Sequence, residues 1–266
     1  MSELSSVTIA LQPQRNAQIP AWLGRAAQAH FLHTLAALNP ILSSAIHDAQ
    51  GAKPFTSSTL IGARKSGEMV QLSERDKLYL RYTTLHPQLT KVFHRGMLPQ
   101  WDGSEVLLHN QPLKVVSVEN HGLWSDQSDY VKLVDHAPLH YKVTMNFTSP
   151  TSFKRTAGGF TPLPQPELVF SSLLDRWNAF APFRLPDWLY DTIHRDIVID
   201  QARIQTETLS FARGHKGVVT GFTGRVTYRL LCYGEACRYL NALARFAKFS
   251  GVGVKTSVGM GQVKAA

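Results

Sequence analysis

The sequence contains little cysteine, no long apolar run and no segment typical of export. Only Cys232 and Cys237 are cysteines. They are close in sequence and have no histidine nearby, so they neither define a zinc site nor require a disulfide. The N-terminal residues lack the basic region and apolar run of a signal peptide, and no stretch approaches the roughly twenty apolar residues that span a bilayer. We therefore expect a cytoplasmic protein with reduced thiols and no membrane association.

The sequence also lacks the Walker pattern Gly-x-x-x-x-Gly-Lys-Ser/Thr, although glycine and lysine come together near its end. The residues concerned are Gly251, Gly253, Lys255, Thr256, Gly259 and Gly261. Glycine allows positive φ and close backbone approach, and a cation with a hydroxyl suits a phosphate. The segment predicts a loop that contacts a phosphodiester backbone. A tight turn before a last strand at 261–264 is the alternative.

Acidic residues are scarce relative to basic ones. The chain has 28 Lys and Arg against 19 Asp and Glu, a formal net charge of +9. Such a surplus favours a polyanionic partner, because neutralisation of phosphates dominates nucleic-acid affinity. A merely basic protein is the alternative. The 44% hydrophobic and 18% charged residues indicate a folded core and argue against disorder.

Hydrophobic periodicity predicts the same order of elements twice. Strand, helix, strand, strand, helix and strand are expected at 6–12, 21–38, 54–61, 77–84, 90–96 and 105–118. The proline after Asn39 is expected to end the first helix, because the residue before proline avoids the helical region. The order then recurs, with a strand at 140–148, a helix at 164–180, a hairpin of 199–213 with 218–233, and a helix at 235–249.

This order is that of the ferredoxin-like unit, so the expected fold is α+β with tandem ferredoxin-like domains, similar to RNA-recognition motifs, and a C-terminal glycine-rich loop. The polar stretch 119–129 is the expected linker, which gives domains at 1–128 and 129–266. The halves share the order of elements and no evident sequence identity.

Basic residues gather at three places in the second half. Period two places Arg225 and Arg229 on the outward face of a strand, either solvated or facing RNA. The candidate RNA contacts elsewhere are Lys154 and Arg155, and a hairpin tip with Arg213, His215 and Lys216. No aromatic run of the RNP type accompanies them, which argues against stacking of single strands on the sheet.

Three stretches together resemble one family. They are residues 251–261, Gly-Val-Gly-Val-Lys-Thr-Ser-Val-Gly-Met-Gly; residues 162–178, from Pro-Leu-Pro-Gln-Pro-Glu to Asp-Arg-Trp-Asn; and residues 46–58, Ile-His-Asp-Ala-Gln-Gly-Ala-Lys-Pro-Phe-Thr-Ser-Ser. They are similar to the glycine-rich loop, the second-domain helix entry and the active-site stretch of the CRISPR repeat-processing endoribonucleases (CRISPR-associated protein six). The resemblance extends from about Thr8 to Val263.

The resemblance implies cleavage of CRISPR repeat RNA within each repeat, without a metal or other cofactor, to release guide RNAs for antiviral defence. The 2′-hydroxyl attacks the adjacent phosphate and leaves 2′,3′-cyclic phosphate and 5′-hydroxyl ends. That chemistry needs a base, an acid and a cation. Histidine suits the proton transfers, since its unperturbed pKa is about 6.5.

The resemblance also implies site residues. His47 falls on the family's catalytic histidine, and Lys53 matches a lysine that some members use in catalysis. Those members carry a tyrosine on the preceding helix, which this chain lacks, so His33 is the nearest replacement as general base. His30 and His33, three apart on a helix, lack the further ligand that a metal site would need.

Two other functions remain open from the sequence. The same fold could bind repeat RNA and deliver it to a CRISPR effector complex without cutting it, or it could be a general RNA-binding module. The sequence leaves open whether the protein is a monomer or a homodimer, and which histidine is acid and which is base.

Overall fold

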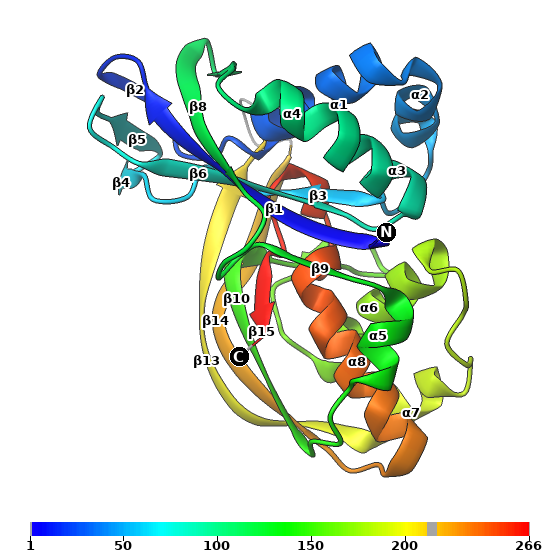
Figure 1. Cartoon of the computed structure of the whole chain (residues 1–266). Coiled ribbons are helices and arrows are strands. Elements are labelled where there is room, and N and C mark those ends of the chain that lie inside the picture. Colours follow the sequence, from blue (N-terminus) through cyan, green and yellow to red (C-terminus); the bar gives the residue numbers. More distant parts are fainter. Residues whose placement is uncertain (1, 212–216, 266) are drawn as a thin grey trace. The chain divides into compact units, whose positions relative to one another are not determined.

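The computed structural model describes residues 2–211 and 217–265 (Figure 1). Its contacts divide the chain into two compact units. The first comprises Met1–Ser128 together with Ser257–Gly259, and the second comprises Asp129–Thr256 together with Met260–Ala266. A short segment near the C-terminus therefore packs within the first unit, although it is distant in sequence from the rest of that unit.

The first unit is an antiparallel sheet covered by helices on one face. Its elements are β1 (Leu4–Pro13), β2 (Ala17–Pro20), α1 (Gly24–Leu38), α2 (Pro40–Asp48), β3 (Phe55–Ser57), β4 (Arg64–Ser66), β5 (Met69–Leu72), β6 (Leu78–Thr84), α3 (Pro87–Val92), the π-helix η1 (Phe93–Met97), α4 (Leu98–Trp101), β7 (Glu105–Leu108), β8 (Gln111–Glu119) and β9 (Asp126–Ser128). The main sheet has the order β3-β6-β1-β8-β7, and β9 pairs with β1. β2, β5 and β4 form a separate small sheet.

The core of this unit follows from alternation along β1. Val7, Ile9 and Leu11 are fully buried and share one face of the strand, because successive side chains point to opposite faces. Helix α1 packs on this face, and its Phe31 stacks on Phe55 of β3 with ring centroids 4.3 Å apart. The opposite face of the sheet carries Thr8 and other polar side chains.

Asn39-Pro40 both ends one helix and begins another. The prediction that α1 ends here is confirmed, but the sequence analysis missed α2, which starts at Pro40 itself. Proline suits the first helical position, where its missing N–H would have no partner, and the Asn39 Oδ1 accepts the Leu42 N–H at 3.0 Å. α2 therefore turns away from α1 and carries the segment that includes His47.

The helix expected at 90–96 is longer and irregular. It runs through α3, η1 and α4, from Pro87 to Trp101, with the π turn in its middle. Pro99 lies just after this turn. Since proline cannot donate a backbone hydrogen bond to the preceding turn, the helix loosens there.

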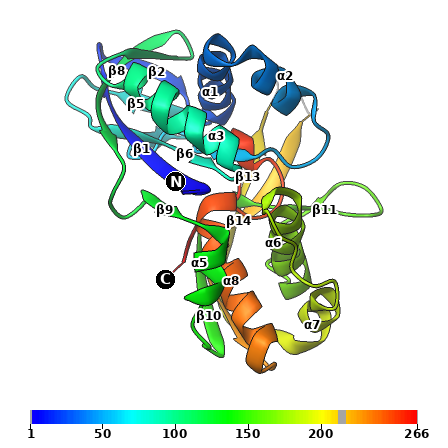
Figure 2. The same ribbon diagram turned by 45° about the vertical axis from the view of Figure 1, so that its right-hand side comes forward.

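The second unit repeats the architecture. Its elements are α5 (Tyr130–Asp135), β10 (Lys142–Thr151), β11 (Phe153–Lys154), β12 (Phe160–Thr161), α6 (Pro166–Phe180), α7 (Leu189–Asp196), β13 (Ile197–Ser210), β14 (Val218–Leu230), α8 (Gly234–Ser250) and β15 (Val263–Ala265), and the 3-10 turn η2 (Thr256–Val258) begins at its edge. The sheet order is β13-β14-β10-β15, with α6 and α8 against it (Figure 2).

Both units therefore have the ferredoxin-like order, and the predicted α+β fold with tandem ferredoxin-like domains is confirmed. The outward face of β14 is also as predicted. Val226 and Tyr228 are buried, whereas Arg225 and Arg229 are exposed. Arg229 is not a free cation, since it lies 3.1 Å from Asp200.

The polar stretch 119–129 is ordered. It ends β8, forms β9 against β1, and stays within the first unit as far as Ser128. In the described ranges, 2–211 and 217–265, no helix is long and apolar enough to cross a bilayer.

Candidate active site and glycine-rich loop

His47 lies in the last turn of α2, with its side chain 75% exposed. Its Nδ1 is 3.0 Å from Asp48 Oδ1, and the same hydrogen bond holds the pKa of the Asp48 carboxyl below its usual value. A carboxylate can only accept, so Nδ1 carries the hydrogen and Nε2 is the atom left to exchange a proton. This arrangement leaves the histidine oriented by its neighbour and open to a ligand.

Lys53 closes the end of the same helix. Its Nζ donates to the carbonyl oxygens of Ile46, His47 and Ala49 at 2.7, 2.8 and 2.6 Å. The last carbonyls of a helix have no partner within it, and a cation there is favoured by the helix dipole. Because an ammonium has three N–H donors, these three bonds use all of them. Lys53 thus fixes the backbone that carries His47.

His33 and His30 occupy different environments on α1. His33 is exposed. His30 has Nδ1 3.1 Å from the Tyr82 hydroxyl and packs on Trp101, with ring centroids 4.6 Å apart. Burial, aided by the charge of His33, lowers the pKa of His30 to about 4. His30 is therefore a partly buried residue that is neutral at pH 7, whereas His33 is exposed.

The described residues contain no cluster of potential metal ligands. Over the part of the chain that the structure describes, no group of three or more His, Cys, Asp or Glu side chains is placed to hold a metal ion. Cys232 and Cys237 are both buried and free, and burial raises the pKa of the Cys232 thiol to about 11.

The glycines of the C-terminal loop are buried and are required by packing within the second unit. A Cβ on Gly253 would lie 2.3 Å from Ser152 O, and one on Gly261 would lie 2.0 Å from Val252 O. A Cβ on Gly251 would lie 2.9 Å from Gly261 O, a less severe clash, and all three glycines have positive φ. Their common role is to let backbone strands of the loop approach one another, which any side chain would prevent.

Arg176 of α6 fixes this loop through buried hydrogen bonds. Its Nη1 donates to Ser250 O at 3.2 Å and to Thr256 Oγ1 at 2.8 Å, and its Nη2 donates to Gly253 O at 2.5 Å. Ser172 of the same helix accepts the Gly253 N–H at 2.9 Å. Burial lowers the pKa of Arg176 to about 10, which still leaves it charged at neutral pH. The sequence analysis missed Arg176. Its position three residues after Leu173, on the apolar side of a helix, was the available signal.

The tip of the loop belongs to the first unit. Ser57 Oγ donates to Ser257 O at 2.6 Å, and Gln28 Nε2 donates to Ser257 Oγ at 3.0 Å. A Cβ on Gly24, the first residue of α1, would lie only 1.8 Å from Val258 O. The tip is thus seated on the helix that also carries His33, and Gly24 makes this approach possible.

The predicted RNA contacts differ in accessibility. Lys154 and Arg155 are exposed on the β11–β12 hairpin, and Lys255 is half-buried with a φ of 57° and its Nζ 4.9 Å from the Phe211 ring centroid. Thr256 is 4% exposed, and its hydroxyl faces Arg176. Gly251, Gly253, Gly259 and Gly261 are buried. Arg213, His215 and Lys216 lie outside the described residues.

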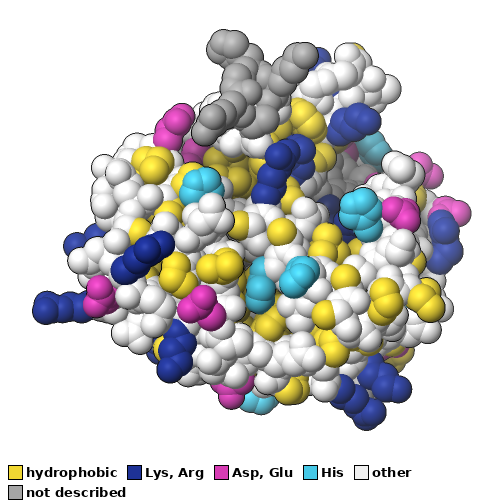
Figure 3. All heavy atoms as spheres, turned by 90° about the horizontal axis from the view of Figure 1, so that it is seen from above, with side chains coloured by type: hydrophobic (Ala, Val, Ile, Leu, Met, Phe, Trp, Pro, Cys, Tyr) yellow, Lys and Arg dark blue, Asp and Glu magenta, His cyan; other side chains and the backbone are white. Residues whose placement is uncertain are grey.

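Exposed basic groups are visible on the face shown in Figure 3. Histidine side chains lie at this surface beside Lys and Arg and among hydrophobic side chains. Such a mixed surface offers both charge and apolar contact to a ligand.

Two ferredoxin-like units with a glycine-rich loop between the last helix and the last strand define a tandem ferredoxin-like protein. The following known proteins of similar sequence and structure are all of one kind. The family described as CRISPR-associated endoribonuclease Cas6 matches residues 145–263. A Cas6 of Thermus thermophilus, solved as a product complex, has a TM-score of 0.83 and 29% identity, with 100% of both chains covered. Another Cas6, solved as a substrate mimic complex, has a TM-score of 0.77 and 26% identity over 100% of both chains.

Curated relatives agree. CRISPR-associated endoribonuclease Cas6 of Streptococcus thermophilus is 25% identical over 217 residues, covering 74% of this chain and 87% of the relative. That of Mycobacterium tuberculosis is 29% identical over 138 residues, covering 52% of this chain. The match spans only 43% of the Mycobacterium protein. The chain is thus similar to Cas6 proteins over most of its length, and the Cas6 family model matches its second unit.

Replacing Arg176 by Met should loosen the loop. The carbonyls of Ser250 and Gly253 would lose buried charged donors, so we expect the free energy of unfolding to fall by about 3 kcal/mol. Urea denaturation measures the loss, and hydrogen exchange should show faster exchange at the Val254 and Met260 amides. Arg184→Met, at an exposed arginine of the same unit, is the control. Equal losses in the two variants would contradict the assignment.

Acid should destabilise the first unit through His30. The pKa of His30 is about 4 in the folded protein and 6.5 in the unfolded chain. Between these pH values the unfolded chain therefore binds more protons than the folded protein. The stabilisation is complete above pH 6.5 and is lost as pH falls towards 4, by up to about 3 kcal/mol. His30→Gln should flatten the pH dependence of urea-derived stability across this window, whereas His121→Gln, at an exposed histidine of the same unit, should not. An unchanged slope in His30→Gln would refute the buried neutral histidine.

Proposed function

We propose that this chain is a metal-independent endoribonuclease that cleaves CRISPR repeat RNA within each repeat to produce guide RNAs. The observation that carries the proposal is His47, exposed at the end of α2 with Nδ1 bonded to Asp48 and Nε2 open. Similarity to Cas6 proteins supports the substrate class, and the similar proteins solved as product and substrate mimic complexes support RNA as the ligand.

In the proposed reaction the 2′-oxygen attacks the adjacent phosphorus as its proton leaves. The bond from phosphorus to the 5′-oxygen breaks, and that oxygen takes up a proton. The products are a 2′,3′-cyclic phosphate and a 5′-hydroxyl. His47 exchanges one of these protons through Nε2, and His33 is the candidate for the other. No electron transfer or further reactant is needed.

Positioning and charge come from other residues. Lys53 keeps the α2 terminus in place through its three carbonyl partners, so it acts on His47 through the backbone. Lys255 supplies a cation at the glycine-rich loop, and Lys154 and Arg155 extend the basic surface on their hairpin. In this proposal, Arg176 and the glycines shape the loop while Lys255 meets the phosphate.

Substitution of His47 by Ala should lower the cleavage rate by about 10²–10⁴-fold while leaving RNA affinity within about twofold, because the ring moves protons and contributes little to binding. The assay is single-turnover cleavage of the cognate repeat RNA in excess EDTA. His136→Ala, at an exposed histidine of the second unit, is the control. RNA with a 2′-deoxy nucleotide before the scissile phosphate should not be cut.

Three outcomes would count against the proposal. Cleavage by His47→Ala within a few-fold of the unmodified protein would remove His47 from the chemistry. Loss of cleavage in EDTA, restored by metal, would refute metal independence. Tight binding without any cleavage would favour a protein that holds repeat RNA for delivery.

Lys255→Ala should weaken repeat-RNA binding and make its salt dependence shallower. Losing one phosphate contact reduces the slope of log K against log salt by about 0.7–0.9. Fluorescence anisotropy at salt concentrations of about 50–200 mM measures this slope. Lys248→Ala, a change of equal charge on α8, is the control. An unchanged slope would mean that Lys255 contacts no phosphate, and would favour the alternative that the glycine-rich loop is only a tight turn.

A further inference from the structure

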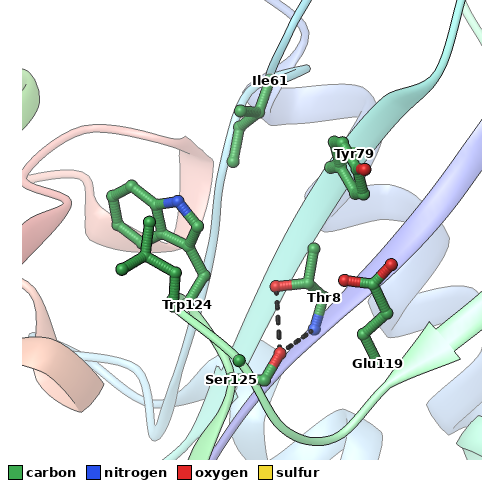
Figure 4. A pocket seen from close by; sticks show the side chains of 8 residues that line it. Thr8, Ile61, Tyr79, Glu119, Trp124 and Ser125 are labelled. Carbon is green, nitrogen blue, oxygen red and sulfur yellow. Dashed lines mark hydrogen bonds between the residues drawn. The ribbon is translucent and has the colours of Figure 1, made fainter.

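A small cavity lies on the side of the first unit's sheet away from the helices. Its volume is about 260 Å³, and it is lined by Thr8, Ile61, Tyr79, Glu119, Gly122, Leu123, Trp124 and Ser125. Figure 4 shows Trp124 and Ile61 on one side of the space, with Tyr79 and Glu119 on the other. The volume is just below the range of about 300–1,000 Å³ typical of ligand pockets, which suits one flat ring system.

The cavity walls are aromatic and held in place. Arg81 is buried, which lowers the pKa of its guanidinium to about 9 and still leaves it charged at neutral pH. Its Nε donates to Ser6 Oγ at 2.9 Å and to Trp124 O at 3.2 Å. Its guanidinium also lies 5.4 Å from the Trp124 ring centroid. The hydroxyl of Ser125 donates to Thr8 Oγ1 and accepts the Thr8 N–H. The loop that follows β8 is therefore tied to β1 and β6, and Trp124 is presented in a fixed position.

Glu119 provides open hydrogen-bond acceptors at this site. Among the described residues, the one ionic contact of its carboxylate is with Lys77 Nζ, 3.9 Å from Oε1 and beyond hydrogen-bond distance, and the carboxylate accepts no hydrogen bond from them. The same Lys77 Nζ lies 5.5 Å from the centroid of the Tyr79 ring. An acceptor pair, two aromatic rings and a nearby cation thus meet at one place.

We propose that this cavity binds one unpaired guanine base of the RNA, with Glu119 accepting its N1–H and N2–H groups. An ionised carboxylate can only accept, and guanine alone presents two adjacent donors on its pairing edge. Unpaired RNA bases are commonly stacked on aromatic side chains and read along this edge. Trp124 and Tyr79 supply the stacking surface, and Lys77 lies where the adjoining phosphate can reach it. The inference rests on the proposed function of this chain as an RNA-binding nuclease.

Short labelled RNAs test this without knowledge of the repeat. We would measure anisotropy with hexauridine carrying a single central guanosine, inosine or adenosine, and with hexauridine alone. The guanosine RNA should bind about tenfold more tightly than the adenosine RNA, and inosine, which lacks the N2 amine, should fall between them. Equal affinities for all four RNAs would overturn the proposal.

Substitutions locate the effect. Glu119→Gln should abolish the preference for guanosine over adenosine, because the amide offers one acceptor and one donor. Glu105→Gln, which removes the same charge from β7, should keep the preference. Trp124→Ala should weaken binding of every RNA that carries a purine, and Trp124→Phe should restore most of it. Far-ultraviolet circular dichroism and melting confirm that each variant folds. A preference retained in Glu119→Gln would place guanine recognition elsewhere.

Two further experiments distinguish a failure of the guanine site from a failure of the proposed nuclease function. Guanosine monophosphate that displaces the guanosine RNA at concentrations well below that RNA's own Kd would assign the cavity to a free nucleotide and overturn RNA recognition there. Cleavage of cognate repeat RNA by the unmodified protein tests the nuclease by itself. Cleavage without base discrimination would sink the guanine site alone, and discrimination without cleavage would sink the nuclease alone.

Discussion

One buried cation organises the most distinctive segment of the chain. A loop made of glycines, with backbone packed on backbone, turns several carbonyl groups inward, where no regular structure can satisfy them. Arg176 supplies planar, charged donors to two of these carbonyls and to the Thr256 hydroxyl. A guanidinium in this position is costly to desolvate unless it is fully bonded, so loop and arginine require each other. The left-handed backbone at Lys255 is the part of this arrangement that reaches the surface.

A similar constraint acts at the end of α2. The residues after a helix must leave it at some angle, and here that angle is set by Lys53 across the last carbonyls. An ammonium occupied by three carbonyls is poorly placed to meet a phosphate at the same time. In this protein the lysine therefore acts as an internal cap, and the orientation of His47 depends on it. A lysine at a position that matches catalytic lysines of the resembled family can therefore serve to hold the backbone in place.

Much of the architecture can be predicted from the sequence, because it depends on hydrophobic periodicity. Alternation in β1 and β14 and the apolar stripes of α1 and α6 predicted the two ferredoxin-like orders correctly. Asn39-Pro40 was interpreted only as a stop, although the same pair is also a good start, so α2 was missed. The small β2-β5-β4 sheet and the π turn were missed too, since their strands are short and their pattern is set by tertiary packing. The resemblance pointed to His47 and the glycines, while the partners of Arg176 and Lys53 and the cavity at Trp124 depend on contacts distant in sequence.

The close packing of Val258 against Gly24 also affects the order in which the chain folds. The first unit contains Ser257–Gly259, yet these residues are synthesised only after all of Asp129–Thr256. During translation the N-terminal unit must therefore wait with the start of α1 uncovered, however stable its sheet already is. Contacts between residues so far apart form late, and they add to the contact order of a unit whose first strand already pairs with the distant β6, β8 and β9. The first unit therefore reaches its final packing only when the chain of the second has been made.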